Sequence, residues 1–191
     1  MDPLQRFRDL LARAKQTPGI PEPTGMTLST VGPDGRPSAR IVLLKGLDDE
    51  GFVYYTNQRS RKGREVIAHP DVALTFWWPP LEEQVRIEGR AGRVTDAEAD
   101  AYFASRRRGS QLGAWASHQS EELSSRAELE ARLVAITAQY EGKPVPRPPH
   151  WSGFRVVPSA IEFWKNRQDR LHEREVYSRA GAGWTMQLLN P

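Results

Sequence analysis

The chain has 191 residues, a length typical of one domain that buries a core without disulfides or metal. It contains no cysteine, which excludes thiolate catalysis, cysteine-ligated zinc and iron–sulfur clusters, and a disulfide-stapled secreted scaffold. Its 27 basic and 24 acidic residues leave a net charge of +3, which suits small anionic ligands without requiring nucleic acid. The start shows no basic head before an apolar core, and no apolar run approaches membrane-spanning length. We therefore expect a cytoplasmic protein with no nucleic-acid or membrane partner.

The first half of the chain predicts one helix and then an antiparallel sheet. Asp2 and Pro3 begin a helix within residues 1–17, with apolar residues recurring on one side. Short turns connect the strands that follow, and Ser60 could cap a short helix among them. The predicted strands are Met26–Val31, Ser38–Lys45, Phe52–Thr56, Asp71–Trp78 and Gln84–Val94, the last bent near Gly89 or Gly92. Five strands within residues 26–94 predict a small barrel or a strongly coiled sheet.

The second half predicts a helical segment, 95–141, and closing strands within 150–191. Capping boxes at Thr95–Glu98 and Ser125–Glu128 begin two helices, the first ending near Arg106. Residues 107–120, which contain two glycines, are expected to be irregular. The closing strands are predicted at Phe154–Val157, Ile161–Lys165, Leu171–Ser178 and Trp184–Leu189. The whole chain, 1–191, is thus predicted to be a single mainly β domain with flanking helices, of the α+β class.

Residues Arg40 to Lys45 form an aliphatic run with a cation at each end. Period-two alternation places Arg40 and Lys45 on opposite faces of the predicted strand. A buried strand rarely keeps a cation without an anion to meet it. Two interpretations remain open here: a core strand whose long cations reach solvent, or a strand lying against an anionic cofactor or substrate.

Two other sets of side chains suit an anion. Arg170, His172 and Arg174 alternate along one predicted strand, so they share a face that would either meet an anion or simply be a solvated sheet edge. Tyr102, Arg106 and Ser110 are spaced by four and would align if one helix continued to Ser110. Such donors suit a phosphate, although a basic helix end that complements the helix dipole would have the same pattern.

Other polar residues are more ambiguous. Arg61 and Lys62 lie at a possible helix start, where backbone amides add to the attraction for an anion, or they form a solvated pair. Gln84, Gln119 and Ser120 could donate to a ring carbonyl or a phosphate, or could be plain surface. No glycine-rich nucleotide fingerprint or Walker loop is present, and the four histidines are too scattered to predict a metal site.

A set of short motifs lies along the chain in a fixed order: Arg40–Lys45, Tyr55–Asn57 with Ser60–Lys62, Gln84-Val85, Tyr102-Phe103 with Ser105-Arg106, Ser110–Ser117 leading to Gln119-Ser120, Glu162–Trp164, Arg170–His172, and the ending Leu189–Pro191. In this order and spacing, the motifs resemble the pyridoxamine 5′-phosphate oxidase family of FMN-dependent flavoproteins over nearly the whole chain.

The resemblance implies an antiparallel split β-barrel homodimer with FMN at the subunit interface. By matching positions, the FMN-binding residues would be Arg40, Ile41, Val42, Leu43, Leu44, Lys45, Tyr55, Thr56, Arg61, Lys62, Gln84, Gln119, Ser120, Trp164 and Arg174. Substrate would be bound by Lys45, Tyr102, Arg106, Ser110, Arg170, Leu171 and His172, with Arg170 and His172 as the catalytic pair. The implied reaction oxidises pyridoxamine or pyridoxine 5′-phosphate to pyridoxal 5′-phosphate, with O2 as electron acceptor and H2O2 as a product.

Two departures from the family pattern bear on the substrate. Family members usually carry a basic, tyrosine-containing segment ahead of the first helix, and this sequence shows none there. Lys165-Asn166-Arg167 replaces a less bulky, glycine-containing stretch and would narrow the pocket. The alternatives are an FMN-dependent oxidase of a secondary-metabolite pathway, of the phenazine type, and a non-catalytic flavin- or pyridoxal-phosphate-binding protein. The presence of Lys45, Tyr102, Arg106 and Ser110 favours the vitamin B6 substrate.

Overall fold

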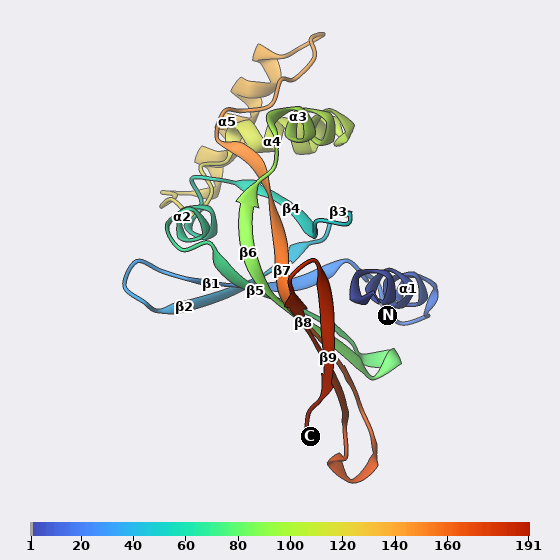
Figure 1. Ribbon diagram of the computed structural model, residues 1–191. Helices are drawn as coiled ribbons and strands as arrows, with labels where there is room; N and C mark the ends of the chain where they lie inside the picture. The colour runs from blue at the N-terminus through green and yellow to red at the C-terminus, as the bar shows by residue number, and fades with distance from the viewer. Residues whose placement is uncertain (1) are drawn as a thin grey trace.

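A nine-stranded antiparallel sheet with helices around it makes up the computed structural model, which describes residues 2–191 (Figure 1). Every strand pairing is antiparallel, as the short turns predict. The strands are β1 (Gly25–Val31), β2 (Pro37–Leu43), β3 (Gly46–Leu47), β4 (Phe52–Asn57), β5 (Asp71–Trp78), β6 (Glu83–Arg93), β7 (Trp151–Lys165), β8 (Glu173–Ala180) and β9 (Gly183–Leu188). The helices are α1 (Pro3–Gln16), α2 (Arg61–Ala68), α3 (Asp96–Ser105), α4 (Arg108–Ala116) and α5 (Arg126–Gln139), with short 3₁₀ turns η1 (Pro79–Leu81) and η2 (Gln168–Arg170).

The strand order closes the sheet into a barrel. The order is β2-β1-β5-β6-β7-β4-β3, so β2 and β3 lie at its two ends although only Leu44 and Lys45 separate them in the chain. The sheet must therefore curl until its two edges meet at these residues. The amide of Leu44 donates to the carbonyl of Thr24 beside β1, and the amide of Lys45 donates to the carbonyl of Val53 in β4. The predicted strand Ser38–Lys45 thus ends early, because the chain changes partner strands at Leu44.

Helix α1 fills one side of the barrel. The carboxylate of Asp2 accepts a hydrogen bond from the amide of Leu4, and Pro3 occupies the first helical position. Phe7 is fully buried and packs edge-on against Phe52 and Phe76, with both ring centroids 4.9 Å away. The apolar side of the helix that the sequence predicts therefore packs into the hydrophobic core of the barrel. Across residues 2–191, no helix is long and apolar enough to span a bilayer.

Helices α3, α4 and α5 lie together at one end of the molecule (Figure 1). The capping box of Thr95 and Glu98 forms as predicted, whereas Ser125 caps α5 alone because the Glu128 carboxylate accepts from Ser124 instead. The prediction of an irregular segment over residues 107–120 is wrong, because Arg108–Ala116 is helical. Gln111 and Leu112 are buried there, so tertiary packing outweighs the low helix propensity of the two glycines.

The β7–β8–β9 region also differs from the prediction. Phe154–Val157 and Ile161–Lys165 are parts of one strand, β7, and Pro158 lies opposite a register shift at Glu88/Gly89. A proline donates no ladder hydrogen bond, so an irregularity is where a long strand tolerates one. The bend near Gly89 is confirmed. Strand β8 begins only at Glu173, which leaves Arg170 in η2 with a φ of 61° and His172 between the two elements.

Candidate active site

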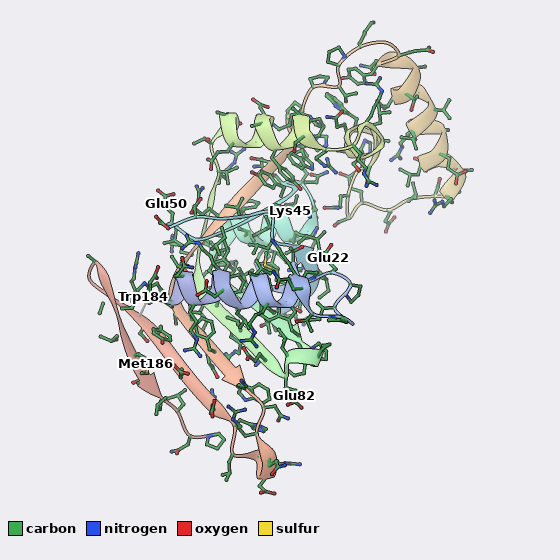
Figure 2. All side chains as sticks on the ribbon, turned by 90° about the vertical axis from the view of Figure 1, so that its right-hand side faces the viewer. Glu22, Lys45, Glu50, Glu82, Trp184 and Met186 are labelled. Carbon is green, nitrogen blue, oxygen red and sulfur yellow. The ribbon has the colours of Figure 1, made fainter. Side chains whose placement is uncertain are left out.

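A cavity of about 510 Å³ lies at the place where the two edges of the barrel meet. Residues of helices α3 and α4 line its other side. Figure 2 shows Lys45 between α1 and the α3–α5 helices. The lining includes three basic side chains and no carboxylate among the described residues. The lining residues are Ile41, Val42, Leu43, Lys45, Tyr55, Thr56, Asn57, Lys62, Tyr102, Arg106, Ser110, Gly113, Ala114, Ser117, Gln119 and Trp151. Such a cavity favours anionic ligands.

Tyr102, Arg106 and Ser110 all line this cavity, but not for the reason that their spacing predicts. Helix α3 ends at Ser105, and Arg106 has extended backbone angles, φ −74° and ψ 149°. Ser110 belongs to the separate helix α4. The alignment of all three residues on one continuous helix is therefore wrong. The side-chain amide of Gln111 donates to the carbonyls of Phe103 and Ala104, which fixes the turn that brings the two helices together.

The Arg106 guanidinium lies against aromatic faces rather than against a carboxylate. Its central carbon is 4.9 Å from the ring centroid of Trp151 and 5.5 Å from that of Phe103. Its Nη1 atom is buried without a hydrogen-bond partner in the structure. Burial lowers the pKa of Arg106 from its ordinary value, with a smaller opposing effect from Tyr102. A buried nitrogen that lacks an acceptor is costly, and a phosphate oxygen is the kind of acceptor that a guanidinium N–H takes.

Lys62 supplies the second cation of the cavity. It follows the N-terminus of α2, where the Ser60 hydroxyl accepts from the amide of Gly63. The Lys62 ammonium donates to the side-chain carbonyl of Gln119 over 2.9 Å, and Thr56 donates to the same oxygen over 3.3 Å. Burial lowers the pKa of Lys62 from its ordinary value, and the nearby positive charge of Arg40 lowers it further. The ammonium also donates to the hydroxyls of Thr56 and Ser60, both over 3.4 Å, so its three acceptors are uncharged and its positive charge remains available to an anion.

Arg40 meets its anion inside the protein. Its guanidinium donates to the Glu65 carboxylate over 3.1 Å, and Arg61 donates to the other oxygen of Glu65 over 2.7 Å. Neither arginine lines the cavity, and the Glu65 side chain is only 4% exposed. Leu44 is buried in the core, and Ser120 is exposed just beyond Gln119 with a φ of 72°. These four predicted cofactor residues therefore lie beside the cavity, outside its lining.

The remaining predicted residues form a second cluster at the opposite end of the sheet. Gln84, Trp164 and Arg174 are direct neighbours across β6, β7 and β8. The ring of His172 lies 4.5 Å from that of Trp164, and Arg170 lies in η2 nearby. Arg174 is paired with Glu162 over 2.7 Å. Because Arg170 and His172 precede β8, the prediction that they share one strand face with Arg174 is wrong.

This second cluster, comprising Gln84, Trp164, Arg170, Leu171, His172 and Arg174, contributes nothing to the cavity of the same chain. Figure 1 places the start of β8 at the far end of the molecule from α3 and α4. One chain therefore holds two separated sets of predicted site residues. The exposed side chains of Leu171, Met186 and Leu188 in this region leave apolar surface available for a protein contact.

Trp151 is a cavity residue to which the sequence prediction gives no role. Its indole ring is parallel to that of Tyr55 within 6° at 5.3 Å, and Tyr55 is parallel to Tyr102 within 11° at 4.0 Å. Gly153 is paired with Tyr55 across β4 and β7, and a Cβ there would lie 2.8 Å from the tyrosine ring. A glycine in the interior of a strand is the sequence signal for such close approach.

Comparisons with known proteins identify the family and the fold of the chain. Residues 12–151 match the family model described as pyridoxamine 5′-phosphate oxidase. Residues 151–191 match the model described as the pyridoxine 5′-phosphate oxidase C-terminal dimerisation region. A Myxococcus xanthus protein named pyridoxine/pyridoxamine 5′-phosphate oxidase is 63% identical over 190 residues, covering 100% of this chain and 92% of that protein. A Rubrobacter xylanophilus protein of the same name is 56% identical, covering 100% of this chain and 87% of that protein.

Two solved structures extend the similarity to the fold. PhzG from Burkholderia lata 383, solved in complex with tetrahydrophenazine-1-carboxylic acid, is 34% identical with a TM-score of 0.93, covering 100% of this chain and 93% of that one. A pyridoxamine 5′-phosphate oxidase-related, FMN-binding protein from Nostoc punctiforme is 17% identical with a TM-score of 0.77, covering 100% and 99%, and so supports the fold alone. The split-barrel fold class predicted from the sequence is confirmed.

Proposed function

The chain belongs to the pyridoxamine 5′-phosphate oxidase family, whose members are flavin-dependent oxidoreductases, and on that premise we propose a specific reaction. The protein oxidises pyridoxine or pyridoxamine 5′-phosphate to pyridoxal 5′-phosphate, with FMN as cofactor and O2 as electron acceptor, and releases H2O2. The observation that carries the proposal is the cavity, in which Lys45, Lys62 and Arg106 converge without a lining carboxylate. Two phosphate groups, one on the cofactor and one on the substrate, would account for this charge.

The cavity divides naturally between the two phosphates. Lys62, Thr56 and Gln119 form one connected donor group at the start of α2 and would hold the FMN phosphate. Lys45, Arg106, Tyr102 and Ser110 form the other group and would hold the substrate phosphate. The unpartnered Nη1 of Arg106 supports this assignment, because a phosphate oxygen would satisfy it. Ile41, Val42 and Leu43 line the same cavity and would support the flavin ring.

FMN, when bound, supplies the chemistry: it accepts a hydride from the substrate carbon and returns the electrons to O2. The protein's own part is placement and charge. The two phosphate-binding groups would set the distance and angle between the reacting rings, which converts binding energy into orientation. Arg170 and His172 would contact the substrate ring and assist loss of its proton, without a covalent nucleophile.

Arg170 and His172 reach a substrate only if a second subunit supplies them, because their cluster does not line the cavity of the same chain. We therefore propose a homodimer in which each site combines the cavity of one subunit with the second cluster of the other. The match of residues 151–191 to a dimerisation region supports this arrangement, since that range contains Trp164, Arg170, His172 and Arg174. FMN would then lie at the subunit interface.

One experiment tests the proposed reaction directly. The purified protein is loaded with FMN, and oxygen uptake is followed with pyridoxine 5′-phosphate, pyridoxamine 5′-phosphate and the unphosphorylated vitamers as matched controls. We expect uptake with both phosphates and a much lower kcat/KM without the phosphate, because Lys45 and Arg106 then lack their anion. A flavin-loaded protein with no uptake on either phosphate would reject the proposal.

The similarity to PhzG favours a second candidate, oxidation of a different ring in a phenazine-type pathway. The four donors Lys45, Tyr102, Arg106 and Ser110 argue against it, because a carboxylated ring without a phosphate has no need of this full set. Tetrahydrophenazine-1-carboxylic acid in the same oxygen-uptake assay separates the two candidates. Faster turnover of that compound than of the vitamin B6 phosphates would favour the second.

A further inference from the structure

We propose that Trp151 is the positioning residue of the substrate phosphate site, holding Arg106 and Tyr102 in the geometry that receives the phosphate. The inference rests on the proposed function, since it concerns the same cavity. Trp151 begins β7 and is 6% exposed. It lines the cavity, and its contacts with Arg106 and Tyr102 connect it to the donors assigned to the substrate.

The first step of the argument concerns Arg106. Within residues 2–191 this guanidinium has no ion pair with a carboxylate, so no anion of the protein orients it. Its position depends instead on the faces of Trp151 and Phe103, at 4.9 and 5.5 Å. A guanidinium on an aromatic face keeps its in-plane N–H groups available to an incoming anion. An aromatic support therefore orients Arg106 without neutralising it, as a carboxylate would.

The second step concerns Tyr102. Its ring is parallel to Trp151 within 6° at 6.1 Å, and both rings are parallel to Tyr55, which lies 4.0 Å from Tyr102. The three rings form an offset stack that fixes the plane in which the Tyr102 hydroxyl lies. The backbone of Trp151 is fixed by Arg147, which donates to the Trp151 carbonyl over 2.8 Å. Arg147 also forms ion pairs with Asp96 and Asp100 of α3. A rigid support of this kind reduces the entropy lost when the phosphate binds.

The test compares Trp151→Leu, which removes the aromatic face, with Trp151→Phe, which keeps one. Trp115 provides the matched control, because it packs with Trp151 in the hydrophobic cluster of Phe103, Leu112 and Val145 but does not line the cavity. Among the described residues, the aromatic rings that contact the Arg106 guanidinium are those of Phe103 and Trp151. Three quantities are measured for each variant: KM and kcat for pyridoxine 5′-phosphate, the Kd of FMN, and the Kd of pyridoxal 5′-phosphate by equilibrium dialysis, with inorganic phosphate as competitor.

We expect Trp151→Leu to raise KM and the pyridoxal 5′-phosphate Kd by about tenfold, with kcat and the FMN Kd changed by less than about threefold. Trp151→Phe should recover most of the loss, and Trp115→Leu should leave both ligand constants unchanged. Unchanged ligand binding in Trp151→Leu would overturn the inference. Equal losses in Trp115→Leu would also overturn it, because they would show that general packing of the cluster is responsible.

The same measurements separate this inference from the proposed function. A wild-type protein that binds pyridoxal 5′-phosphate in competition with inorganic phosphate, yet oxidises neither vitamin B6 phosphate, would refute the proposed reaction. The expected loss of binding in Trp151→Leu would still support the role of Trp151 in that case. A wild-type protein that binds no phosphate ester would refute both.

Discussion

Arg40 and Lys45 flank the same short aliphatic run, yet their side chains have different surroundings. Arg40 donates to Leu28, Thr30, Ser38 and the buried carboxylate of Glu65, whereas Lys45 is exposed to the cavity. The pKa of Glu65 is lowered from its ordinary value by its hydrogen bonds and cations, although burial itself opposes this. The anion that pairs with Arg40 is thus Glu65, a residue of the protein itself.

We expect different losses when each of these two cations is removed. Arg40→Ala should lower the free energy of unfolding by roughly 2 kcal/mol, because Glu65 then keeps only part of its pairing. Lys45→Ala should leave stability within about 0.5 kcal/mol and mainly raise KM for the phosphorylated substrate. Urea denaturation and steady-state kinetics measure the two effects. Equal stability of the two variants would contradict the structural role of Arg40, and a normal KM in Lys45→Ala would contradict the substrate role of Lys45.

Gly153 is a second position where a single residue controls the site. A Cβ there would lie 2.8 Å from the Tyr55 ring and 3.0 Å from Val94. We expect Gly153→Ala to cost about 1–3 kcal/mol of stability and to weaken FMN binding, because Tyr55 must move. Gly92→Ala is the control, since a Cβ at that strand position meets nothing within 4 Å. Thermal unfolding and FMN titration measure the effects, and equal behaviour of the two variants would show that Tyr55 adapts without cost.

Among the elements, strands and caps follow from local pattern, whereas the connections between them do not. The limits of β5, Asp71–Trp78, and the capping box at Thr95 could be predicted because alternation and cap chemistry are local. Helix α4 could not, since its two glycines argue against helix and only burial of Gln111 and Leu112 reveals it. Likewise the break at Leu44 depends on closure of the barrel, which no local pattern encodes.

The site shows the same division. The family resemblance predicts that Lys45, Tyr102, Arg106 and Ser110 act together, and the structure has all four in the lining of one cavity. The spacing-based reason for linking Tyr102, Arg106 and Ser110, alignment along one helix, is wrong. Spacing fails there because Arg106 lies in a turn between two helices. It fails again for Arg170, whose φ of 61° takes it out of the strand. Trp151 could not be assigned, because its role depends on two rings and a guanidinium from distant parts of the chain.

The capping box of α3 makes a prediction about stability and pH. Hydrogen bonds from Thr95, with a further contribution from Arg155, lower the pKa of Glu98 from its ordinary 4.5 to about 2. A carboxyl group whose pKa is lower in the folded state stabilises the fold above about pH 4.5 and loses this contribution as the pH falls toward about 2. We expect Glu98→Gln to cost roughly 1 kcal/mol at neutral pH, a modest value because the side chain is partly exposed.

The difference between wild type and Glu98→Gln should shrink as the pH falls through the range from about 4.5 to about 2. Urea denaturation at neutral pH and at several acidic values measures this dependence. Glu141→Gln, a substitution at an exposed position just after α5, controls for the loss of one negative charge. A difference between Glu98→Gln and wild type that stays constant with pH would contradict the lowered pKa of Glu98 and hence the hydrogen bonds from Thr95 that chiefly cause it.

At the scale of the whole molecule, the separation of the two sets of site residues is the dominant feature. The cavity lies beside α3 and α4, while the β7–β8 connection with Arg170 and His172 lies at the other end (Figure 1). Figure 2 shows Trp184 and Met186 on β9, the strand that pairs with β8. A monomer could not bring both sets to one substrate without unfolding the sheet. The proposed homodimer can, because a two-fold axis exchanges the two ends.

This arrangement predicts complementation between inactive variants. Arg106→Ala damages the cavity and Arg170→Ala damages the second cluster, so each homodimer alone should have little activity at substrate concentrations well below the wild-type KM. When the two chains are co-refolded at equal amounts, random pairing makes half of the dimers hybrids, and each hybrid has one site with both lesions and one site with none. The expected recovery is about a quarter of the wild-type activity.

The control pairs Arg106→Ala with Lys45→Ala. Both lesions affect the cavity, so every site of a hybrid dimer carries one lesion and no recovery should follow. Equal activity in the two mixtures would mean that each site is built within one subunit, and Arg170 would then need another role.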